Sequence, residues 1–134
     1  MRLVLGKILV QFAVASAFAF GGFFTSFYSF DKFILWRLNL ESHFQTCAFL
    51  AAFLGIPIGS VLGISLADKL FFKSRGFNVS GIVVGLLLCV LAVALATWLL
   101  RGRTGNIGMV SIPFIASFFS LVGYNFPQLL RLLK

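Results

Sequence analysis

The sequence predicts an all-α integral membrane protein, a single domain built as a bundle of four transmembrane helices. Of its 134 residues, 60% are hydrophobic and only 10% are charged, with a mean hydropathy of +1.08. Soluble domains contain roughly 45–50% apolar and about 25% charged residues, so this class is excluded. Four long windows lack Asp, Glu, Lys and Arg, and about 20 apolar residues suffice for a helix to cross a bilayer core of about 30 Å. A transmembrane barrel is excluded because the windows show no alternating segments of about ten residues.

The first predicted span covers residues 8–30. Arg2, Lys7 and the small residues 15–17 resemble a secretory signal peptide with its cleavage site. However, the apolar run continues to Phe30, and cleavage would leave a stump too short to cross the membrane. We therefore expect a retained first span.

The connection after the first span carries large apolar residues at helical spacing: Phe33, Trp36, Leu40 and Phe44. This spacing predicts a short helix that lies in the membrane interface and begins at Asp31 as its N-cap. A loop with an aromatic belt is the alternative.

The remaining spans are predicted at residues 44–67, 77–100 and 105–130. Pro57 lies inside the second span and is expected to kink it near Phe53, because proline removes one backbone hydrogen bond. The connection at residues 68–75 is short, so the second and third spans are expected to form a tight antiparallel hairpin.

The charge balance favours a membrane surface over nucleic acid as the partner. Eleven Lys and Arg against three acids give a formal charge of +8, and the basic residues lie between the spans. This placement is typical of contacts with anionic lipid headgroups. Seven basic residues fall on the side of both termini and four on the other side. The positive-inside rule then places both termini in the cytoplasm, and we expect the bacterial inner membrane.

Small residues recur every four positions in three of the spans, which places them along one helix face. In the second span these are Cys47, Ala51, Gly55, Gly59, Gly63 and Ala67. The third span has Gly81, Gly85 and Cys89, and the first has Ala13, Ala17, Gly21 and Thr25. Faces without bulk allow helices to pack closely in lipid. They predict either internal packing, with stripes facing each other, or an interface with a second copy or another membrane protein.

The sequence offers no chemistry inside the predicted spans. Asp31, Glu41 and Asp68 are expected at span ends or in connections, and His43 at the entry to the second span. Cys47 and Cys89 have no metal-ligand spacing and are interpreted as packing residues. We therefore expect no catalytic residues, no cofactor and no metal site, and hence no enzyme.

Uncharged polar residues share a broad face in two spans. These are Thr25, Ser26 and Ser29 in the first span and Ser117, Ser120 and Tyr124 in the fourth. Such residues turn inward to find hydrogen-bond partners. They are expected either to join the helices or to line a path for a permeant.

Two short segments show resemblances. Residues 21–30 are similar to a segment of the small fluoride channels, but in that family the segment belongs to the third span and follows a pore Asn in the second. We draw no function from it. Asn125-Phe126 followed by Arg131 is similar to the end of the small GtrA-like proteins, although that family's Gly-Asn pair is missing from the first span here. The second resemblance implies movement of lipid-linked sugars.

Two functions follow as expectations. The first is a non-catalytic accessory, assembly or immunity-type partner of another membrane protein, which acts through helix packing. The second is a small oligomeric channel or translocator for an anion or a lipid-linked headgroup.

Overall fold

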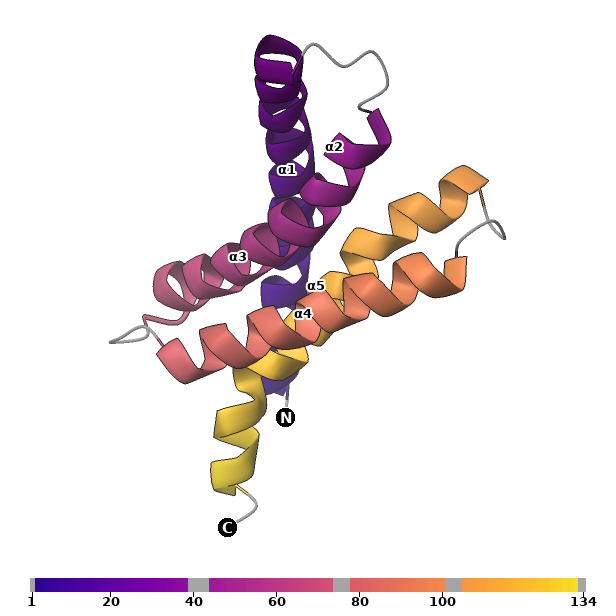
Figure 1. Cartoon of the computed structure of the whole chain (residues 1–134). Coiled ribbons are helices and arrows are strands. Elements are labelled where there is room, and N and C mark those ends of the chain that lie inside the picture. The colour runs from indigo at the N-terminus through magenta and orange to yellow at the C-terminus, as the bar shows by residue number, and fades with distance from the viewer. Residues whose placement is uncertain (1, 39–43, 74–77, 101–104, 133–134) are drawn as a thin grey trace.

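The described part of the chain is almost entirely helical, with only Phe72, Lys73 and Asn78 outside the helices. The computed structural model describes residues 2–38, 44–73, 78–100 and 105–132 (Figure 1). The elements are α1 (Arg2–Leu38), α2 (Phe44–Leu50), the π-helix η1 (Ala51–Gly55), α3 (Ile56–Phe71), α4 (Val79–Leu100) and α5 (Gly105–Leu132).

Three helical segments are long and apolar enough to cross a membrane: Leu5–Phe33, Cys47–Phe71 and Val79–Leu100. In α5, the shorter stretch Val110–Phe126 is also apolar. The all-helical, membrane-type character predicted from composition is therefore confirmed.

The segment after the first span is a continuation of α1. This helix has 37 residues and ends at Leu38, so residues 31–38 form no separate interfacial helix, and Asp31 lies inside α1 rather than at a helix start. That expectation is wrong because no proline or glycine follows Gly22 within α1, and a helix propagates where no residue breaks it. Residues 39–43, which include Leu40 and Glu41, lie outside the described part.

The distortion expected from Pro57 is present as the π-helix η1. The backbone N–H of Ile56 bonds to the carbonyl of Ala51, five residues earlier, and α3 then starts with Pro57 in its first turn. Proline has no backbone N–H to donate, and a π-bulge accommodates this without ending the helix. The second span therefore bends between α2 and α3, as Figure 1 shows.

The helices pair differently from the expected hairpin of the second and third spans. The most extensive contacts join α1 with α3 and α4 with α5, whereas α3 and α4 touch much less. Figure 1 shows α4 and α5 running side by side. A short connection keeps the end of α3 near the start of α4 but does not require the two helices to pack along their lengths. Their small residues instead pack against α1 and α5.

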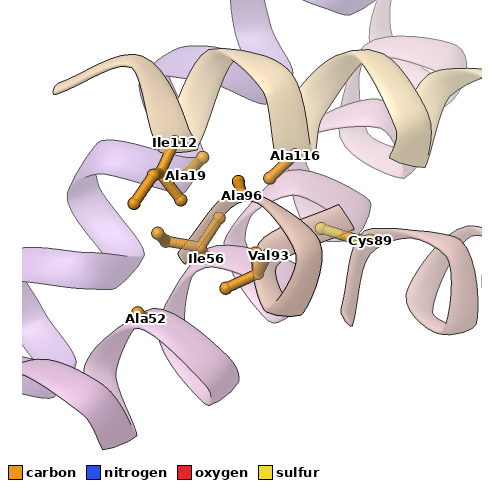
Figure 2. Close-up of a cluster of buried hydrophobic side chains, with 8 residues drawn as sticks. All are labelled: Ala19, Ala52, Ile56, Cys89, Val93, Ala96, Ile112 and Ala116. Carbon is orange, nitrogen blue, oxygen red and sulfur yellow. The ribbon is translucent and has the colours of Figure 1, made fainter. Parts of the chain in front are cut away.

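The main apolar core lies where α1, η1, α3, α4 and α5 meet, and Figure 2 shows its side chains pointing toward one another. Its members are mostly small: Ala19, Ala52, Ile56, Cys89, Val93, Ala96, Ile112 and Ala116. A second cluster of Ala15, Ile64, Leu121 and Tyr124 lies closer to the start of α1. Small side chains let the helix backbones approach closely, so close contact between helices stabilises this core more than large side chains do.

Candidate functional site

The glycine stripe of the second span packs against α1. A Cβ on Gly55 would lie 2.5 Å from the carbonyl oxygen of Gly22, and one on Gly63 would lie 2.9 Å from the Cα of Ala15. A Cβ on Gly59 would overlap the carbonyl oxygen of Phe18. These contacts are with backbone, so the two helices touch along the whole stripe. Cys47, Ala51 and Ala67 on the same stripe are fully buried.

The stripe of α4 has a different partner, α5. A Cβ on Gly81 would lie 2.5 Å from the carbonyl oxygen of Tyr124, and one on Gly85 would lie 3.1 Å from that of Ser120. The approach is equally close from the side of α5, where a Cβ on Gly123 would lie 2.8 Å from the Cα of Gly85. The stripes of the second and third spans therefore pack inside the chain but do not face each other.

The stripe predicted on the first span is exposed. Ala13, Ala17, Gly21 and Thr25 all face outward, and a Cβ on Gly21 would meet no described atom within 4 Å. The face that meets α3 carries Ala15, Ala19 and Gly22 instead. The expectation that this stripe faces a neighbouring span is wrong, because α1 has small residues on two faces and α3 packs on the other one.

This outward stripe forms one wall of a groove between α1 and α3. The groove has a volume of about 500 Å³ and opens to the outside of the bundle. Small and apolar residues line it: Ala17, Phe18, Gly21, Gly22, Thr25, Ser26, Gly55, Ile58, Gly59 and Leu62.

A buried acid lies at one end of the same pair of helices. Asp68 was expected in a connection, but it lies in the last turn of α3 and its side chain is only 5% exposed. Its carboxylate accepts three donors: Lys7 Nζ at 2.8 Å, Gln11 Nε2 at 3.1 Å and Tyr124 Oη at 3.3 Å. Asp68 therefore lies at the end of the candidate span Cys47–Phe71, and its burial among polar groups of α1 and α5 was not expected.

The groups around Asp68 form a network that joins three helices. The Asn125 side chain donates to Gln11 Oε1 at 3.4 Å, and Lys7 lies 5.2 Å from the centre of the Phe72 ring. We call Lys7, Gln11, Asp68, Tyr124 and Asn125 the Asp68 cluster. Removal of a charge from water is costly unless it is paired and hydrogen-bonded. The three donors meet this condition for Asp68, and the 29% exposed Lys7 leaves the cluster open at one side.

Serine hydroxyls continue the polar character into the bundle. Ser117 donates to the carbonyl of Pro113 at 2.7 Å and lies 3.4 Å from the hydroxyl of Ser60. Ser16 and Ser120 are buried, and their hydroxyls make no hydrogen bond within the described residues.

The six residues predicted as a polar lining fall into two groups. Thr25 and Ser29 are exposed on α1, where Ser29 donates to the carbonyl of Thr25 at 2.8 Å, and Ser26 is half-buried in the groove. Ser117, Ser120 and Tyr124 are buried on α5. The structure brings Tyr124 to Asp68 but does not join the two groups into one lining.

Four members of the Asp68 cluster were not predicted from the sequence to form a site: Lys7, Gln11, Asp68 and Asn125. A signal was present, since Lys7 and Gln11 are one helical turn apart, and Asp68 follows Ser60 and Ile64 at intervals of four. Residues at this spacing share a face, and the face of Ile64 is buried. Because a span was taken to end at its first charged residue, Asp68 was not assigned to the buried face of Ile64.

Comparison with known proteins adds no assignment. The chain matches no protein-family model, and no curated protein or solved structure is significantly similar to it. Within the described residues, no group of three or more His, Cys, Asp and Glu is placed to hold a metal ion.

Proposed function

We propose that this chain is a four-span protein of the bacterial inner membrane, with both termini cytoplasmic, that translocates a phosphate-bearing lipid headgroup. The observation that supports this proposal best is the Asp68 cluster. The cluster lies at the end of the candidate span Cys47–Phe71, where lipid phosphates would lie, and buried ionisable groups with specific partners are candidates for a ligand site. Lys7 is the basic member of the cluster and its side chain reaches the outside of the bundle.

The cluster favours an anionic group as the ligand. The carboxylate of Asp68 already accepts three donors, so its charge is balanced within the protein. An arriving phosphate offers Lys7 a second acceptor, and Arg and Lys bind phosphate through short charge-assisted hydrogen bonds. The Lys7 ammonium carries three N–H donors, so it can bond a phosphate while it keeps its bond to Asp68, and the buried carboxylate stays paired.

The buried hydroxyls support a polar route beyond the cluster. Tyr124, Ser120 and Ser117 follow one another on one face of α5, and Ser60 of α3 lies opposite Ser117. Hydroxyl groups replace lost water contacts for a polar group that crosses the bilayer. The unpaired hydroxyl of Ser120 is a donor available to such a group.

The test is headgroup movement in vesicles of phosphatidylcholine and phosphatidylglycerol that contain a fluorescent phosphatidylglycerol. Crossing is measured from the fraction of probe that an impermeant reductant quenches. We expect Lys7→Gln and the pair Ser117→Ala with Ser120→Ala to slow crossing. Lys32→Gln is the matched control, because Lys32 is an exposed lysine on α1 that lies over the ring of Tyr28, away from the cluster. Equal rates for the wild type and both test variants would contradict the proposal.

A second candidate function is the accessory or immunity-type partner that acts through helix packing. The outward stripe of Ala13, Ala17, Gly21 and Thr25 favours it, because small residues every four positions allow another helix to approach. The inward glycine stripes do not, since they already pack within the chain. Co-purification from native membranes in mild detergent tests this candidate: a stoichiometric partner protein supports it, and its absence contradicts it.

A further inference from the structure

We infer that the groove between α1 and α3 binds a hydrocarbon chain of the same lipid whose phosphate is held at Lys7. This inference rests on the proposed function, because it gives the headgroup site a neighbouring site for the lipid tail. It identifies the ligand as an intact anionic lipid rather than a free anion.

The groove and the Asp68 cluster lie along the same helix pair. α1 and α3 run antiparallel, with Lys7 beside Asp68 at one end and Gly22 beside Gly55 further along. Ala17, where the groove begins on α1, is ten residues after Lys7, which corresponds to about 15 Å at 1.5 Å per residue. That distance is about half of a hydrocarbon core of about 30 Å. A lipid with its phosphate at Lys7 therefore brings its chain to the depth of the groove.

The surface of the groove suits a flexible chain. Glycines form its floor, and the rim carries Phe18, Ile58 and Leu62, which are 41%, 51% and 56% exposed. A Cβ on Gly21 would meet no described atom within 4 Å, so the floor is open at that point. A methylene chain fills an irregular apolar groove by rotating its own bonds and needs no matching side chains.

Charge at the end of the helix pair distinguishes a lipid from a second copy of the chain. Lys7 pairs with Asp68, and the exposed Lys73, two residues after the end of α3, adds a further positive charge at this end. An anionic lipid supplies the negative charge that this end lacks. In a symmetric dimer through the groove, two such basic ends would face each other at the same depth and repel.

The experiment measures lipid binding by native mass spectrometry of the full chain, delipidated and then mixed with phosphatidylglycerol. Gly21→Leu adds a large apolar side chain to the lining of the groove, and its Cβ would meet no described atom within 4 Å. Gly6→Leu is the matched control, because a Cβ on Gly6 also meets no described atom within 4 Å but lies outside the groove. We expect wild type and Gly6→Leu to bind equally, and Gly21→Leu to bind about tenfold more weakly, since the displaced chain loses its apolar contact.

Two further ligands separate the tail from the headgroup. Diacylglycerol carries the chains without the phosphate, and glycerol phosphate carries the phosphate without the chains. We expect Gly21→Leu to weaken diacylglycerol binding and Lys7→Gln to leave it unchanged. Unchanged binding of phosphatidylglycerol by Gly21→Leu would overturn the groove inference. The headgroup proposal would then be tested separately, by the effect of Lys7→Gln on lipid crossing. A homodimer or a bound foreign helix that Gly21→Leu releases would also overturn it.

A crosslinking measurement on the wild type covers the case in which Gly21→Leu does not fold. Phosphatidylglycerol with a photoreactive group in its chain should label the segment that carries Ala17 to Ser26. Labels spread evenly over α4 and α5 would contradict the inference.

Discussion

The contact between α1 and α3 at Gly59 can be tested by adding a single methyl group. In Gly59→Ala, the new Cβ overlaps the carbonyl oxygen of Phe18 and lies 2.9 Å from its carbonyl carbon and 3.2 Å from the Cα of Ala19. Ordinary carbon contacts are about 3.5–4.0 Å, so α1 must move away by roughly 0.5–1 Å. All three atoms are backbone, and no side-chain rotation can relieve the overlap.

The magnitude follows from a matched pair of variants. Inserting a methyl group into a packed site costs about 1–3 kcal/mol, while replacing a helical glycine by alanine gains up to about 1 kcal/mol. Gly21→Ala makes the same gain on α1 without any contact, because its Cβ would meet no described atom within 4 Å. The difference between the two variants removes the shared gain, so Gly59→Ala should be less stable than Gly21→Ala by about 1–3 kcal/mol.

Unfolding of both variants by denaturing detergent, followed by circular dichroism in micelles, measures this difference. A stability of Gly59→Ala equal to that of Gly21→Ala within about 0.5 kcal/mol would refute the close approach of the two helices.

Three further predictions concern buried groups. Asp68→Asn should lower the free energy of unfolding by about 1–3 kcal/mol. Lys7→Gln should lower it less in the Asp68→Asn protein than in the wild type. Additive effects of the two substitutions would show that the two groups do not interact. Tyr124→Phe should cost about 1 kcal/mol, because it removes the hydrogen bond to Asp68, and unchanged unfolding would argue against this bond. Cys47 and Cys89 are free and fully buried, so a maleimide should label neither in micelles and both after unfolding; rapid labelling of the folded protein would contradict their burial.

Composition and spacing predicted the helical, membrane-type character of the chain and the small-residue faces on its helices. Both follow from properties of single helices: apolar length decides whether a segment can enter lipid, and a four-residue period decides whether one face lacks bulk. Pro57 likewise predicted a local distortion, which the structure contains as the π-helix η1.

The partners of the stripes were not predictable in the same way. On α1, both the series Ala13, Ala17, Gly21 and the pair Ala15, Ala19 consist of small residues, so the sequence cannot tell which face meets α3. The Asp68 cluster was missed for a related reason. Its members are 57 residues apart between Gln11 and Asp68 and 114 residues apart between Gln11 and Asn125, and only tertiary packing brings them together.

Whether the protein alone moves a phosphate-bearing headgroup across a bilayer can be measured from the rate of lipid crossing in vesicles. Purified wild-type chain in vesicles of phosphatidylcholine and phosphatidylglycerol is compared with protein-free vesicles, with a fluorescent phosphatidylglycerol as the probe. We expect the probe to cross faster with the protein present, in proportion to the amount reconstituted. A crossing rate equal to that of the protein-free vesicles would contradict it.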